Sequence, residues 1–147
     1  MKILEEIRET RLQESVLLAE SAGGTRIALA RTPGYSTRAA FFGLRFGSNH
    51  VHFRNPEGKV VHVPWGSAHF LEHKLFEGRE EKVFDRFGRL GANFNGGTSF
   101  ARTSYYFVTS QHFEAATEVL LDFVQDPLIT EERVEKEKGI IEQEVRM

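Results

Sequence analysis

Two histidines and a glutamate lie within five residues of one another in this sequence, at His69, Glu72 and His73. The histidines are four residues apart, so on an α-helix their imidazoles lie one turn apart on the same face. Two imidazoles placed in this way can bind one zinc ion at about 2.0–2.1 Å. Glu72 lies beside them and can hold and deprotonate a water on the metal. The pattern HxxEH is the zinc-hydrolase motif H-E-x-x-H in reversed order.

A zinc site of this kind needs a third ligand from elsewhere in the chain. Three fixed residue types in five positions recur by chance, so surface or capping histidines are the alternative interpretation. Glu77 continues the same helix face, but it is eight residues from His69, about 12 Å along the axis at 1.5 Å per residue. Ligands strung along one straight helix do not converge on a tetrahedral ion. The third ligand is therefore expected from another element.

Two carboxylates on the last predicted helix are candidates for that ligand. With Val134 set at 0° and steps of about 100°, Glu137 falls at about 300° and Glu144 at about 280°, inside an apolar arc from about 240° to 20°. Glu142 falls at about 80°, outside the arc. Carboxylates on an apolar face are costly unless a cation or donor meets them. Either they pair with an arginine such as Arg133, or one binds a metal and the other supports the ligands.

The elements that must position these residues follow from periodicity and turn signals. Residues 1–14 are charged and are expected to form a short helix or a frayed arm. Gly23 and Gly24 indicate a hairpin between the first two strands. Residues 92–97 are a glycine-rich passage. Strands are expected at residues 15–20, 25–31, 39–47 (well buried), 60–63 and 98–110, and helices from 66, at 83–90, at 112–125 and from Thr130.

The uneven mixture of strands and helices indicates the fold class. It lacks the regular alternation of βαβ units, which favours an α+β fold: a mainly antiparallel sheet with helices packed on one face. The 147 residues, 40% of them hydrophobic, suffice for one core and suggest a single domain.

Composition excludes several classes of function. The chain has no cysteine, so its metal ligands must be His, Asp or Glu. Its net charge of -2 argues against a nucleic-acid partner. No apolar run is long enough to span a bilayer, so we expect no membrane association and a cytoplasmic protein.

Two segments together resemble a known family. Residues 66–77 read GSAHFLEHKLFE, which is similar to the metal-binding helix of the pitrilysin, insulysin and mitochondrial processing peptidase superfamily, the inverzincins. Residues 134–144 read VEKEKGIIEQE and resemble the second signature of that family. The likeness is strongest to the bacterial processing-protease-like members.

The resemblance implies a zinc centre and a catalytic mechanism. His69, His73 and Glu144 would be the Zn²⁺ ligands, Glu72 the catalytic base, and Glu137 a supporting acid of the catalytic group. The fourth zinc position would belong to a water that attacks the peptide bond. We therefore expect a zinc metalloendopeptidase, with residues 1–147 as the N-terminal zinc-binding part of its domain, incomplete at the C-terminus.

The resemblance also implies how a peptide substrate binds. Residues 95–105 are similar to the family's substrate-binding edge strand, with Asn95, Gly96, Gly97 and Thr98 as the contact residues. The family usually has alanine and an aromatic residue where this chain has Gly96 and Gly97. Main-chain contacts are thus retained, without the aromatic wall. A second homologous domain or subunit is expected to close over the site.

Two alternatives stay open. The chain could be a peptide-binding subunit of a heteromeric assembly, with a structural or vestigial zinc site, although such members usually lose the HxxEH motif. Separately, His50, His52 and His62 could form a second metal site or could be polar loop residues.

Overall fold

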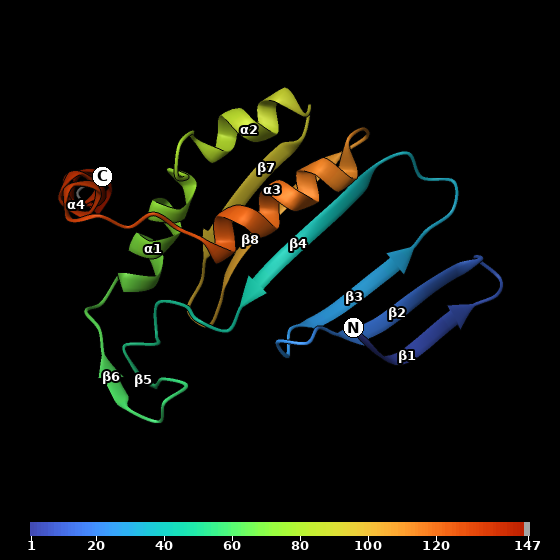
Figure 1. Ribbon diagram of the computed structural model, residues 1–147, viewed down its shortest axis with the longest axis horizontal. Helices are drawn as coiled ribbons and strands as arrows, with labels where there is room; N and C mark the ends of the chain where they lie inside the picture. The colour runs from blue at the N-terminus through green and yellow to red at the C-terminus, as the bar shows by residue number, and fades with distance from the viewer. Residues whose placement is uncertain (146–147) are drawn as a thin grey trace. The chain divides into compact units, whose positions relative to one another are not determined.

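The first 36 residues form a three-stranded antiparallel sheet in the computed structural model, which describes the backbone of residues 1–145 and the side chains of residues 1–139 and 141. The strand order is β1-β2-β3, as Figure 1 shows. The strands are β1 (Lys2–Glu9), β2 (Glu14–Glu20) and β3 (Arg26–Arg31). The hairpin expected at Gly23 and Gly24 is confirmed, with Gly24 at φ 83°.

The expectation for residues 1–14 is wrong, because Lys2–Glu9 is a strand paired with β2. The turn between the two strands places Gln13 at φ 56°. Positive φ is usually taken by glycine or asparagine, so this turn carries no recognisable signal in the sequence. The strand is stabilised by backbone pairing with β2 rather than by burial, since all its residues are exposed.

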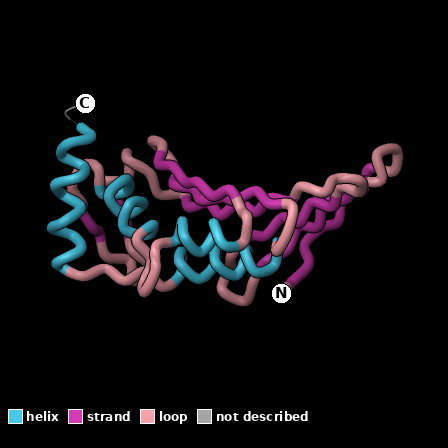
Figure 2. The backbone as a smooth tube through the Cα atoms, turned by 90° about the horizontal axis from the view of Figure 1, so that it is seen from above, coloured by secondary structure: helices cyan, strands magenta, loops and turns pink. Residues whose placement is uncertain are grey.

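Residues from 37 onward form a second compact unit, in which a sheet of three antiparallel strands has the order β4-β8-β7. Figure 2 shows helices on one side of these strands. The α+β prediction is therefore confirmed. The elements are β4 (Arg38–Leu44), β5 (His52–Arg54), β6 (Val60–His62), α1 (Ser67–Phe76), α2 (Val83–Arg89), β7 (Asn93–Thr98), β8 (Thr103–Thr109), α3 (Phe113–Gln125) and α4 (Glu131–Val145).

Two strand predictions need correction. The segment 39–47 is not well buried: the strand is Arg38–Leu44, and Phe41 is 63% exposed. The reason is that β4 lies at one edge of the sheet and α3 covers one face only. The segment 98–110 is not one strand, because Ser99 N–H donates to the carbonyl of Arg102 at 2.8 Å and closes a hairpin between β7 and β8. The glycine-rich passage thereby becomes the strand β7.

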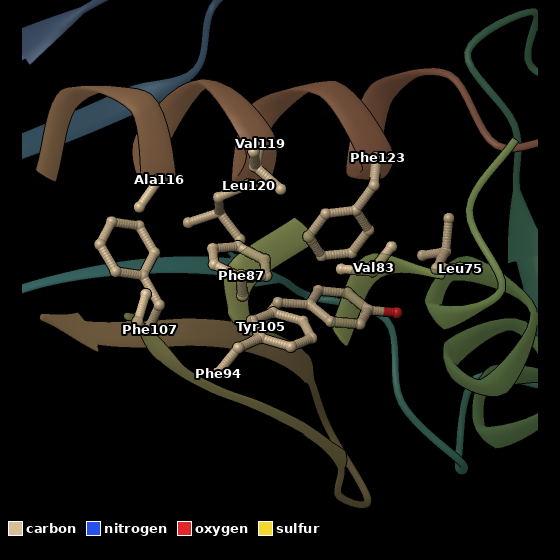
Figure 3. Packing of buried hydrophobic residues seen from close by; sticks show 11 residues of the cluster. Leu75, Val83, Phe87, Phe94, Tyr105, Phe107, Ala116, Val119, Leu120 and Phe123 are labelled. Carbon is tan, nitrogen blue, oxygen red and sulfur yellow. The ribbon is translucent and has the colours of Figure 1, made fainter. Parts of the chain in front are cut away.

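An aromatic core lies between this sheet and the helices (Figure 3). Phe87 of α2 stacks on Phe94 of β7, with ring centroids 4.3 Å apart and planes 5° apart. Phe123 of α3 meets Phe94 and Tyr105 edge-on. Such offset and edge-to-face pairs are the favoured aromatic geometries. The core therefore locks β7 and β8 to α2 and α3, and Leu75 ties α1 to the same cluster.

The helices α1 and α4 pack against each other, and α4 is seen nearly end-on beside α1 in Figure 1. The helix α1 follows Gly66, whose φ of 84° suits a residue without a side chain. The helix α4 begins after Thr130 as predicted, and the Thr130 hydroxyl accepts from Arg133 N–H at 3.3 Å. The pairing of these two helices brings the two signature segments together.

Candidate metal centre

The rings of His69 and His73 converge from one face of α1. Their Nε2 atoms are 3.1 Å apart, and the ring planes are 83° apart. Two nitrogens bound to one tetrahedral zinc at about 2.0–2.1 Å lie about 3.3 Å from each other. Both rings are partly buried. The spacing of the two Nε2 atoms therefore suits two ligands of a single tetrahedral ion.

Glu137 reaches this pair from α4. It is 4% exposed, and its Oε1 is 2.9 Å from His73 Nδ1. A carboxylate only accepts hydrogen bonds, so His73 donates through Nδ1 and carries its lone pair at Nε2. A carboxylate behind a ligating histidine is the usual arrangement around zinc, and it fixes the ring's tautomer.

The alternative expected for Glu137, a pair with Arg133, is not the contact seen. The second carboxylate oxygen of Glu137, Oε2, lies 3.2 Å from Lys74 Nζ. Arg133 instead donates to the carbonyls of Gly78 and Arg79 and lies 3.9 Å from Glu77. Lys74 was missed by the sequence argument. The signal that could have found it is a lysine inside the apolar run of α1, three residues before Glu77.

Glu72 points toward the hairpin of β7 and β8. It is 7% exposed, and its Oε2 accepts from the Thr98 hydroxyl at 2.6 Å. Thr98, expected to contact a peptide, thus also holds the carboxylate that was expected to act as the base. Thr103 lies beside Thr98, and the hydroxyl oxygens of the two threonines are 3.3 Å apart.

Tyr105 adds an unusual group near Glu72. Its hydroxyl is buried, has no hydrogen-bond partner among the described residues, and points toward α1 in Figure 3. Burial, and secondarily the charge of Glu72, raises the pKa of this phenol above its ordinary value.

The glycines of β7 differ in the space around them. A Cβ at Gly96 would lie 2.7 Å from Phe76 and 2.9 Å from Tyr105, whereas at Gly97 it would meet open space. Gly96 N–H is bonded at 2.8 Å to the side-chain oxygen of Asn95. Because β7 pairs only with β8 among the described strands, Asn95, Gly96 and Gly97 lie on a sheet edge.

The expected third ligand lies outside the described residues. The side chains of Glu144 and of its comparison residue Glu142 are not described. Among the side chains that are, no three His, Asp or Glu residues gather in a metal-binding group. The contacts that the described side chains do make are pairwise: His69 with His73, His73 with Glu137, and Glu72 with Thr98.

His50, His52 and His62 do not form one cluster. His52 and His62 face each other across β5 and β6, with ring centroids 4.2 Å apart. His50 instead accepts a hydrogen bond from Gly47 N–H at 3.0 Å. Among the described residues, no metal-binding group of three includes these histidines.

Within residues 1–145, none of the helices has the length and apolar character needed to cross a membrane.

The chain is similar to known proteins. Residues 64–147 match the family described as Insulinase (Peptidase family M16). The chain is 44% identical over 147 residues to the uncharacterized zinc protease YmfH of Bacillus subtilis (strain 168), covering 99% of this chain and 34% of that protein.

Two solved structures have the same fold. An M16-like peptidase from Alicyclobacillus acidocaldarius is 41% identical with a TM-score of 0.87, covering 92% of this chain and 32% of that one. Pitrilysin is 19% identical with a TM-score of 0.73, covering 99% of this chain and 16% of its own.

The chain spans about a third of the length of its more similar relatives. The HxxEH helix and the last helix both lie within the matched residues 64–147. The chain belongs to the M16 family of peptidases, the insulinase and pitrilysin family.

Proposed function

We propose that this chain supplies the zinc-binding half of an endopeptidase that hydrolyses extended peptides. The observation that carries the proposal is the convergence of His69 and His73 at 3.1 Å, with Glu137 behind His73. His69, His73 and Glu144 would hold Zn²⁺. When bound, the ion supplies a water with a pKa near about 7 and polarises the scissile carbonyl.

The remaining steps belong to the chain's own residues. Glu72 takes a proton from the attacking water and delivers it to the leaving amine. Thr98 donates to Glu72 Oε2 at 2.6 Å and thereby limits how the carboxylate turns. Asn95, Gly96, Gly97 and Thr98 line the strand edge to which the peptide is added, and the main-chain hydrogen bonds of an added strand tolerate many sequences.

A peptide-binding subunit with a vestigial zinc site is the second candidate function. The burial of Glu72 and its contact with Thr98 favour the enzyme, since a vestigial site has no need of a held carboxylate. Zinc content together with peptide turnover separates the two functions. A second homologous domain or subunit that closes over the site is part of the proposal, and the cytoplasmic location stays a prediction.

The ligand assignment is tested by zinc binding. We expect the purified chain to hold zinc after dialysis, and His69→Ala, His73→Ala and Glu144→Gln each to lose it. Glu142→Gln should retain zinc, because its helical position points away from the apolar arc. Elemental analysis measures the metal, and circular dichroism checks the fold. Full zinc occupancy in the Glu144 variant would sink the assignment of the third ligand.

A further inference from the structure

Lys74 is a buried ammonium beside the metal centre. It is 3% exposed and lies in α1 beside Leu75, which is also buried. Three acceptors surround its Nζ: the carbonyl of Arg133 at 2.6 Å, Glu77 Oε1 at 2.9 Å and Glu137 Oε2 at 3.2 Å. There is one acceptor for each N–H of the ammonium.

Stability alone does not account for this lysine. Burying a charge is costly before its partners compensate. Replacing a whole buried ion pair by apolar residues is often neutral or stabilising. Apolar side chains in place of Lys74 and its carboxylate partners would therefore serve the packing of α1 against α4 as well. The lysine must be judged by what its partners do.

One partner leads directly to the metal centre. Glu137 uses Oε2 for Lys74 and Oε1 for His73 Nδ1, so both of its oxygens are held. Two fixed oxygens set the plane of the carboxylate, and the carboxylate sets which nitrogen of His73 carries the proton. The other partner, Glu77, also has Arg133 within 3.9 Å and makes no described contact with either histidine.

We propose that Lys74 is a positioning residue of the metal centre, which holds the Glu137 carboxylate so that His73 donates through Nδ1 and presents Nε2 toward the point it shares with His69. This inference rests on the proposed function for its metal, but it concerns a contact that the ligand assignment does not need. It also predicts that Glu77, although it touches the same ammonium, is dispensable for metal binding.

The test compares zinc affinity among matched variants of the full 147-residue chain, by competition with a chromophoric chelator. Lys74→Met should weaken zinc binding by about 10- to 100-fold, the usual effect of losing support behind a ligand. Lys74→Arg should restore most of the affinity because it keeps the charge. The zinc affinity of Glu77→Gln should stay within about twofold of the wild type, because residues that do not contact the ligands usually affect them little.

A double-mutant cycle separates positioning from a merely structural role. Because Lys74 is argued to act through Glu137, Lys74→Met should cost little further affinity in a Glu137→Gln background. An equal loss in both backgrounds would overturn the inference, as would an unchanged affinity in Lys74→Met alone. Should Lys74→Met fail to fold, Lys74→Met/Glu77→Gln removes one of the two carboxylates that lose Lys74 as a partner and is held to the same outcomes.

A measurement without metal keeps this inference distinct from the proposed function. Nitrogen-15 NMR of the metal-free chain at about pH 8, above the ordinary histidine pKa, reports the tautomer of His73. The wild type and Glu77→Gln should show the Nδ1–H form, and Lys74→Met a mixture of the two forms. A wild-type chain that shows this tautomer yet binds no zinc contradicts the proposed function alone. An unchanged tautomer in Lys74→Met contradicts the positioning role alone.

Discussion

Glu72 is held by one hydrogen bond at the centre of the site. Thr98 engages Oε2, so Oε1 is the oxygen that we expect to exchange a proton with the attacking water. Glu72→Gln preserves the shape but removes the basicity. We expect this variant to keep zinc and peptide and to lose turnover by about 10²- to 10⁴-fold.

The measurement is steady-state hydrolysis of a fluorogenic peptide, in whichever assembly makes the wild-type chain active. Glu80→Gln is the matched control, since Glu80 is an exposed glutamate just beyond the end of α1. Hydrolysis by Glu72→Gln at the rate of the control would show that another group acts as the base.

Tyr105 makes stability depend on alkaline pH. Its pKa is raised in the folded chain by burial and by Glu72, so the folded state favours the protonated phenol. That contribution is complete below the unfolded pKa of about 10 and is lost as the pH rises above it. The free energy of unfolding, measured with urea at pH 9, 10 and 11, should fall more steeply in the wild type than in Tyr105→Phe.

The same substitution is informative at neutral pH. The Tyr105 hydroxyl has no hydrogen-bond partner among the described residues, so removing it should leave stability unchanged or raise it slightly. A clear loss of stability in Tyr105→Phe at pH 7 would mean that the hydroxyl has a partner.

At the scale of elements, β7 presents an alternating edge. Ser99 and Arg102 form a hydrogen-bonded pair. Because such pairs alternate along an antiparallel ladder, Gly97 and Asn95 also point their N–H groups at β8. Phe94, Gly96 and Thr98 therefore direct their backbone groups away from the sheet. A peptide added as a strand meets these three residues.

An N-methyl scan of a bound peptide tests this arrangement. Each methyl group removes one N–H donor, and successive donors of an extended strand face opposite sides. Affinity for the Glu72→Gln chain, measured by fluorescence anisotropy, should fall at every second methylated position. A loss that is uniform along the peptide, or absent, contradicts strand addition at β7.

The helices that carry the site could be predicted, whereas part of the sheet could not. The segments α1, α2 and α3 have helical spacing of apolar residues, and Thr130 is a helix-start residue directly before α4. The strand β1 is exposed and is followed by a turn without glycine, so neither periodicity nor turn chemistry identifies it.

The site itself divides in the same way. The histidine pair and the burial of Glu137 follow from helical geometry, because both depend on one helix face at a time. The contacts of Lys74 with Glu137 and of Thr98 with Glu72 join elements that are distant in sequence. Spacing along the chain has no bearing on such pairs, which depend on how α1 packs against α4 and β7.

At the scale of the whole molecule, Lys74 and Arg133 already have hydrogen-bond or ion-pair partners. Lys74 contacts the carboxylates of Glu137 and Glu77, and Arg133 contacts backbone carbonyls and lies 3.9 Å from Glu77. A peptide bond under attack develops negative charge that donors must stabilise. We therefore expect those donors to come from beyond this chain, which spans about a third of its similar relatives.

The corresponding measurement is peptide hydrolysis by the isolated 147-residue chain at a single oligomeric state. We expect turnover well below about 1 s⁻¹, the lower range of ordinary enzymes. Turnover at about 1 s⁻¹ or faster would show that the chain needs no second half.

Asn95 gives the open strand edge a property that concerns solubility. Its side-chain oxygen occupies Gly96 N–H, one of the groups that faces away from the sheet. An edge that can recruit a peptide can equally recruit another copy of itself, which is the route to edge-to-edge aggregation. To form a hydrogen bond with Gly96 N–H, a substrate or a second copy of the chain must first displace the Asn95 side-chain oxygen. We therefore expect this one side chain to weaken peptide binding and edge-to-edge association alike.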